Sequence, residues 1–85
     1  MNNLAVITTK FVLENNSPII SVFRDEDGDW QFFGKENNIS ETDARVVSLN
    51  EILNLDKTIE QIITISKGMQ AFRESKDKDW KTRVY

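Results

Sequence analysis

The sequence contains neither cysteine nor histidine. These absences exclude disulfide bonds, thiol nucleophiles, the usual zinc sites and acid–base catalysis by imidazole. Glycine and proline are also scarce, with three and one in 85 residues, which argues against a disordered or fibrous chain. Because Gly28, Gly34 and Gly68 stand far apart, a glycine-rich phosphate loop is excluded as well.

Long hydrophobic runs are missing too. No run approaches the roughly 18 residues that a membrane span needs, and Met1–Leu4 lacks the basic start and apolar stretch of a signal peptide. We therefore expect no membrane partner and a cytoplasmic location. A chain of 85 residues with 39% hydrophobic and 29% charged content predicts one domain over residues 1–85.

Charge is unevenly distributed along the chain, whose net charge is −3. Residues 1–72 hold 11 acidic and 6 basic side chains, whereas residues 73–85 hold 3 acidic and 5 basic ones. A nucleic-acid-binding protein normally has a basic patch that neutralises several phosphates, and an isoelectric point near 4.8 argues against such a patch. The predicted partner is therefore a basic protein and not a nucleic acid.

Two apolar segments, Ile19–Arg24 and Asp29–Gly34, flank the dipeptide Asp27-Gly28. Asp-Gly fits a two-residue turn because glycine accepts positive φ, so the sequence predicts a β-hairpin over residues 19–34. This turn fixes three cross-strand pairs: Asp25 with Trp30, Phe23 with Phe32, and Val22 with Phe33. Each face of the hairpin then carries an apolar set, Ile19, Phe23, Trp30 and Phe32 on one and Ile20, Val22 and Phe33 on the other. We expect both faces to be at least partly covered.

The other segments have weaker signals. Branched residues over 4–9 predict a strand, and Thr8 or Thr9 can cap a helical turn that follows it. Arg45–Val47 predicts a further strand, and Ser48 with Glu51 forms a capping box that opens a helix through residue 55. An isoleucine-rich stripe over residues 59–63 predicts a second helix lying on the sheet.

Together these elements predict an α+β fold. Its sheet is antiparallel, with three to five strands and the central hairpin 19–34, and one or two helices from about 48–66 cover it. Residues 69–73 continue helically or form a short arm. Residues 74–85 form an edge strand or a mobile tail.

The hairpin tip, Asp25–Asp29, holds four acids in five residues. Carboxylates around a glycine turn suit calcium, but an EF-hand needs alternate ligands over a loop of about 12 residues, so we predict no metal and no cofactor. Acids at a hairpin tip also keep it soluble and discourage edge pairing. The third interpretation is recognition, in which the charged rim and Trp30 contact a partner.

The candidate partner contacts are Asp25, Glu26, Asp29, Trp30 and Trp80. Trp30 has an alternative, because aromatic residues of a small domain usually belong to its core. Trp80 and Tyr85 lie in a charged tail, where an exposed aromatic residue either contacts a partner or packs back on the sheet. Catalysis by carboxylates alone needs two of them across a cleft, with pKa values pushed apart by burial. So small a fold has little room for such a cleft, and we predict no enzymatic activity.

Several motifs occur here in the order that is typical of a small bacterial family. They are Thr9-Lys10, Ser17-Pro18-Ile19, Arg24-Asp25-Glu26, the Trp30, Phe32-Phe33 and Gly34 set, Val47-Ser48-Leu49, Ile52, Leu55-Asp56 and residues 68–72. On these motifs, residues 4–72 resemble a family of domains of unknown function grouped with immunity proteins of bacterial polymorphic toxin systems. The resemblance implies a protein that binds and inhibits a toxin.

The sequence therefore predicts a protein-binding domain without catalytic activity, which the resemblance specifies as an immunity-type inhibitor. The alternative is a structural module that associates with itself through Trp80–Tyr85. We expect a monomer or a weak homodimer.

Overall fold

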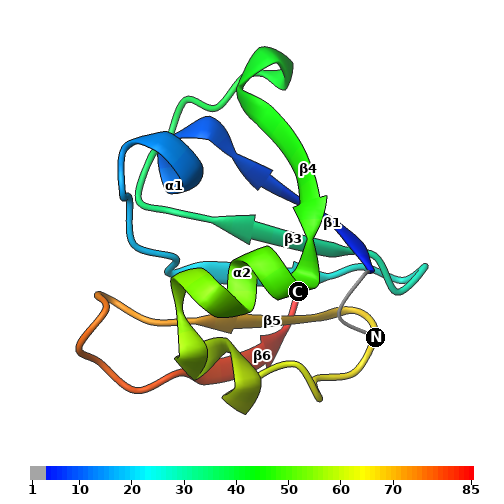
Figure 1. The fold of residues 1–85 in the computed structure, drawn as a ribbon. Helices are drawn as coiled ribbons and strands as arrows, with labels where there is room; N and C mark the ends of the chain where they lie inside the picture. Colours follow the sequence, from blue (N-terminus) through cyan, green and yellow to red (C-terminus); the bar gives the residue numbers. More distant parts are fainter. Residues whose placement is uncertain (1–3) are drawn as a thin grey trace.

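A computed structural model describes residues 4–85 and consists of one six-stranded sheet with helices packed on it (Figure 1). The strand order is β4-β1-β3-β2-β5-β6. In chain order the elements are β1 (Ala5–Thr9), α1 (Lys10–Glu14), β2 (Ser21–Arg24), β3 (Trp30–Phe33), the 3-10 helix η1 (Glu41–Asp43), β4 (Ala44–Ser48), α2 (Leu49–Leu55), the 3-10 helix η2 (Lys57–Gln61), β5 (Met69–Phe72) and β6 (Lys81–Val84).

The α+β class and the central position of the hairpin β2-β3 are confirmed. The fully antiparallel sheet is wrong, because β1 and β3 run parallel, with Ile7 opposite Gln31. The chain leaves β1, forms β2 two positions away in the sheet, and returns in β3 between them. The predicted strand count is too low because residues 69–72, expected as a helix or an arm, form β5 between β2 and β6.

The helices α1 and α2 lie on the same face of the sheet, which we call the covered face (Figure 1). Ser48 caps α2 by accepting a hydrogen bond from the Glu51 backbone N–H, which is the serine half of the predicted capping box. Apolar side chains of the helices and strands form one buried cluster: Val6, Val12, Ile19, Val22, Trp30, Phe32, Leu49, Ile52, Ile59, Ile62, Ile65 and Ala71. Among residues 4–85, no helix has the length and hydrophobicity that crossing a bilayer requires.

The hairpin turn is one residue longer than predicted. The Gly28 N–H donates to the Asp25 carbonyl at 2.9 Å and the Asp25 N–H donates to the Asp29 carbonyl at 3.0 Å, which closes a three-residue loop. Gly28 has a φ of 90°, the left-handed conformation that glycine provides at the end of such a loop. An Asp-Gly pair fits this loop as well as the two-residue turn, so the dipeptide did not decide between them.

The longer loop shifts the register, so the three predicted pairs are wrong. Val22 lies opposite Phe32, and Arg24 lies opposite Trp30. A slip of one residue moves every side chain of a strand to the other face of its partner. Val22, Trp30 and Phe32 therefore share the covered face, and Phe23 lies on the other one, which we call the open face.

A buried ion pair joins segments that are far apart in the sequence. Arg73 Nη2 lies 2.6 Å from Asp56 Oδ2, with side chains 1% and 7% exposed. The same guanidinium donates to the Ile19 carbonyl from Nε and Nη2, and to Thr58 Oγ1 from Nη1. Burial alone would raise the pKa of Asp56, but hydrogen bonds from Thr58 and Arg73 outweigh it and lower that pKa below its ordinary value.

We expect Asp56→Ala to lower the free energy of unfolding by about 3 kcal/mol or more, because it leaves a guanidinium buried without its counter-charge. Glu14→Ala is the matched control. It breaks an exposed pair with Arg45 at 3.8 Å, which should cost less than about 1 kcal/mol. Urea denaturation of both variants measures the difference, and equal losses would contradict the assigned role of the buried pair.

Candidate functional site

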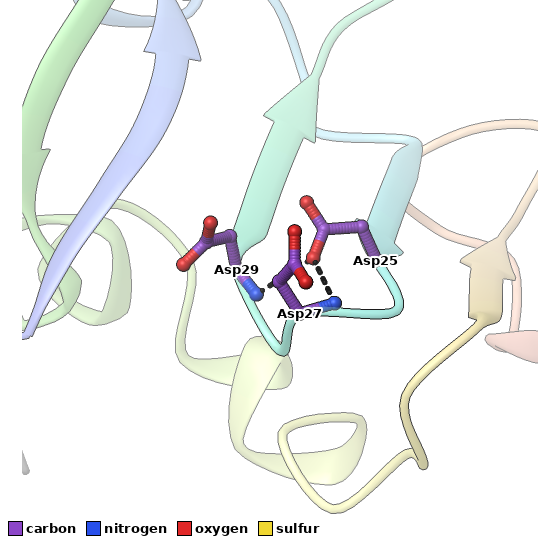
Figure 2. Close-up of side chains that lie close together, drawn as sticks. All are labelled: Asp25, Asp27 and Asp29. Atoms are coloured by element: carbon purple, nitrogen blue, oxygen red, sulfur yellow. Dashed lines mark hydrogen bonds between the residues drawn. The ribbon is translucent and has the colours of Figure 1, made fainter.

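The acidic tip is the loop Asp25–Asp29 between β2 and β3, and Asp25 organises it (Figure 2). Asp25 Oδ1 accepts hydrogen bonds from the backbone N–H groups of Asp27 at 2.9 Å and Asp29 at 3.0 Å. Its side chain is half-buried, whereas those of Glu26, Asp27 and Asp29 are exposed. One carboxylate therefore closes the loop, and three project from it.

Asp25, Asp27 and Asp29 each place a carboxylate oxygen within 4.8 Å of the others. These oxygens are the described groups that could share a hard cation, although backbone N–H groups already occupy Asp25 Oδ1. Negative charge at this density attracts positively charged molecules over several ångströms and raises their rate of encounter. The tip can therefore attract a positively charged partner by its electrostatic field.

Trp30 does not provide the exposed aromatic surface that the recognition interpretation requires. It is 6% exposed and its ring stacks on Phe32 with centroids 6.0 Å apart. The Arg24 guanidinium carbon lies 5.3 Å from the centroid of the Trp30 ring, and Arg24 Nη1 donates to the Ile65 carbonyl at 2.8 Å. Trp30 belongs to the core, which was the alternative interpretation of this residue.

The Trp80 side chain also makes contacts within the protein. Its Nε1 donates to Thr58 Oγ1 at 3.0 Å, its ring lies 4.1 Å from the Arg73 guanidinium carbon, and it packs partly buried against the core. It precedes β6, whereas the tip lies near the other end of that strand. The structure therefore does not bring Trp80 to Asp25, Glu26 and Asp29.

The aromatic residue that does lie beside the tip is Tyr85. It is 54% exposed, and its ring meets Phe23 edge-on with centroids 4.9 Å apart. Phe23 in turn meets Phe33 at 5.9 Å. We call Phe33, Phe23 and Tyr85 the aromatic track, because they follow one another across the open face toward the acidic tip.

The acidic tip also acts on the ionisation of Tyr85. Burial by its neighbours raises the pKa of the phenol above its ordinary value, and the charges of Asp25 and Glu26 raise it further. Local sequence reasoning does not find this site, because 60 positions separate Tyr85 from Asp25. The available signal was the alternation of Lys81, Arg83 and Tyr85 along an edge strand, which puts all three side chains on one face.

A shallow depression of about 360 Å³ adjoins the aromatic track. Phe23, Phe33 and Phe72 line it together with residues of the loop after β3. The open face thus combines half-buried aromatic side chains, a hollow and an acidic end.

The two roles of the tip acids predict different effects on stability. We expect Asp25→Ala to lower the free energy of unfolding by about 1–2 kcal/mol, since two backbone N–H groups lose their acceptor. Asp27→Ala should be neutral or slightly stabilising, because its carboxylate accepts neither of these bonds and repels its neighbours. Chemical denaturation compares them, and an equal loss in both would overturn the assignment of Asp25 as the organising residue.

Tyr85 is the only tyrosine in the sequence, so its ionisation can be followed directly by ultraviolet absorbance. We expect Glu26→Gln to lower the pKa of Tyr85, because one of the two carboxylates that oppose phenolate formation is removed. Glu51→Gln removes an exposed acid from α2 and should leave the titration unchanged. A titration that responds equally to both substitutions would place Tyr85 away from the tip.

Comparisons with protein-family models, with curated proteins and with solved structures returned no match. The resemblance to the immunity-protein family therefore stays a prediction from the motifs.

Proposed function

We propose that this chain is a non-catalytic protein-binding domain that uses its open sheet face and acidic tip to bind a partner with a basic surface. The observation that carries the proposal is the aromatic track, which leads across the open face to the acidic tip. Aromatic anchors beside charged rims are the combination that gives protein interfaces both affinity and a high association rate.

The exposure of the open face supports binding. Beyond the track it carries Ile7 and Val46, which are 38% and 72% exposed and lie opposite each other in β1 and β4. Large apolar side chains gathered on one exposed face are typical of interaction sites in soluble proteins. A partner that covers these side chains would bury apolar area, while the acidic tip would fix the orientation of the bound partner.

The chemistry of the tip supports binding over catalysis. A carboxylate that serves as a general acid needs a desolvated environment that raises its pKa, and the tip acids project from a surface loop. The sequence has no cysteine or histidine to supply a nucleophile or an imidazole base. The proposal therefore assigns these carboxylates to electrostatic attraction.

The motif resemblance favours one kind of partner, a toxin that this chain inhibits. We infer that it would do so by covering a basic surface of the toxin, for which an acidic tip and an aromatic face are suited. Fast association matters for such an inhibitor, and charge at the rim raises the association rate more than it raises affinity.

The partner can be identified with a photoreactive phenylalanine derivative placed at position 85 or at position 55. Tyr85 and Leu55 are similarly exposed, at 54% and 43%, but lie at the acidic tip and on the helix α2. We expect a specific cross-linked product in cells from position 85 and none from position 55. The same product from both positions, or from position 55 alone, would contradict the proposed surface.

With that partner purified, we expect the triple variant Glu26→Gln, Asp27→Asn, Asp29→Asn to associate about tenfold more slowly at low salt. It keeps Asp25, whose carboxylate closes the loop. Replacing the exposed Glu41, Glu51 and Glu60 by glutamine changes the net charge equally and should leave the rate nearly unaffected. Stopped-flow mixing measures both, and equal rates for the two triple variants would refute a role for the tip.

A further inference from the structure

The sheet has two edge strands, β4 and β6, and they differ in how their outer backbone groups are satisfied. On β4, the Arg45 guanidinium donates from Nη1 to the carbonyls of Ala44 at 2.8 Å and Thr42 at 2.9 Å. Arg45 therefore covers part of its own edge. All four residues of β6 are exposed, and no hydrogen bond of this kind occurs along it among the described residues.

The hydrogen-bond pattern tells which groups of β6 point away from the sheet. The Tyr85 N–H donates to the Gly68 carbonyl at 3.2 Å, and Arg83 lies opposite Gln70. In an antiparallel pair, hydrogen-bonded positions alternate with positions whose N–H and C=O face outward. Tyr85, Arg83 and Lys81 therefore bond to β5, while Thr82 and Val84 direct their backbone groups to the free edge.

The charge along this edge is positive. Lys81 and Arg83 stand on the open face, two residues apart and both exposed. Arg83 is held in place, because its Nε donates to Gln70 Oε1 at 2.8 Å and its guanidinium lies over the Phe72 ring at 4.4 Å. Its two terminal nitrogens have no hydrogen-bond partner among the described residues and remain available to a carboxylate.

This charge disfavours a second copy of the chain at the same edge. An antiparallel pair of β6 strands must join through Thr82 and Val84, and the registers with the greatest overlap place Lys81 opposite Arg83 or Arg83 opposite Arg83. Like charges directly opposite each other destabilise a sheet. The edge is therefore better matched to a different chain of opposite charge.

We infer that the free edge of β6 binds an extended segment of another protein that carries acidic side chains at alternate positions. The segment would add a seventh strand, exchanging backbone hydrogen bonds with Thr82 and Val84. Its acidic side chains would lie opposite Lys81 and Arg83 on the open face, where cross-strand pairs of opposite charge are favourable. This surface is distinct from the acidic tip, and the inference stands without the proposed function.

A synthetic peptide of about eight residues, in which glutamate alternates with valine or threonine, is the probe. We expect it to perturb the amide resonances of residues 81–85 and to slow hydrogen exchange at Thr82 and Val84. A peptide with lysine in place of each glutamate should bind at least about tenfold more weakly at low salt. Equal binding of the two peptides, or slowed exchange elsewhere than on β6, would overturn the inference.

Two variants test separately the contributions of backbone hydrogen bonds and of side-chain charge to peptide binding. Thr82→Pro removes one outward N–H, keeps both basic side chains and leaves the ladder with β5 intact, because edge positions facing solvent tolerate proline. It should abolish binding of the glutamate peptide. Lys81→Glu combined with Arg83→Glu should reverse the preference toward the lysine peptide, with Lys81→Glu alone intermediate.

Thermal melting establishes that each variant folds before its binding is measured. Retained binding by folded Thr82→Pro would show that the peptide does not add a strand and would refute the inference. A dimer detected by analytical ultracentrifugation and lost in Thr82→Pro would also refute it, because a second copy would then occupy the edge.

Discussion

The buried ion pair between Arg73 and Asp56 determines which face of the sheet is covered by other segments of the chain. Arg73 follows β5, Asp56 joins α2 to η2, and the guanidinium also holds the Ile19 carbonyl ahead of β2 and the ring of Trp80 ahead of β6. Removing Asp56 leaves a buried guanidinium without its counter-charge, which costs more than an exposed ion pair contributes. All these segments are thereby fixed on the covered face.

The open face follows from this arrangement. With the helices and the segment before β6 held on one side, the other side of the sheet keeps its half-buried phenylalanines and an exposed Tyr85. Its tip end is acidic at Asp25, Glu26 and Asp29, whereas its β6 edge is basic at Lys81 and Arg83. The polarity that the sequence shows between residues 1–72 and 73–85 thus corresponds to two surfaces with opposite preferences for charge.

Local signals in the sequence predicted what depends on neighbouring residues and missed what depends on long-range pairing. The caps at Thr9 and Ser48 and the hairpin at Asp27-Gly28 follow from short-range chemistry and were predicted. The predicted register of the hairpin is wrong, because Asp-Gly fits both a two-residue and a three-residue loop. A loop that is one residue longer moves each side chain of a strand to the other face of its partner. The strand β5 was missed because its four residues become a strand only by pairing with β2 and β6, and the placement of Tyr85 beside the tip depends on the same pairing.

The proposed binding surface requires that one face of the sheet be free in solution. Nuclear magnetic resonance with a soluble paramagnetic agent tests it on the isolated protein, because the agent broadens signals only from side chains that solvent reaches. We expect strong broadening of the ring protons of Phe23 and Tyr85 and little effect on Val22 and Phe32, which are 0% exposed. Equal protection of Phe23 and Phe32 would mean that another part of the protein, or a second copy, covers the face, and would contradict the account.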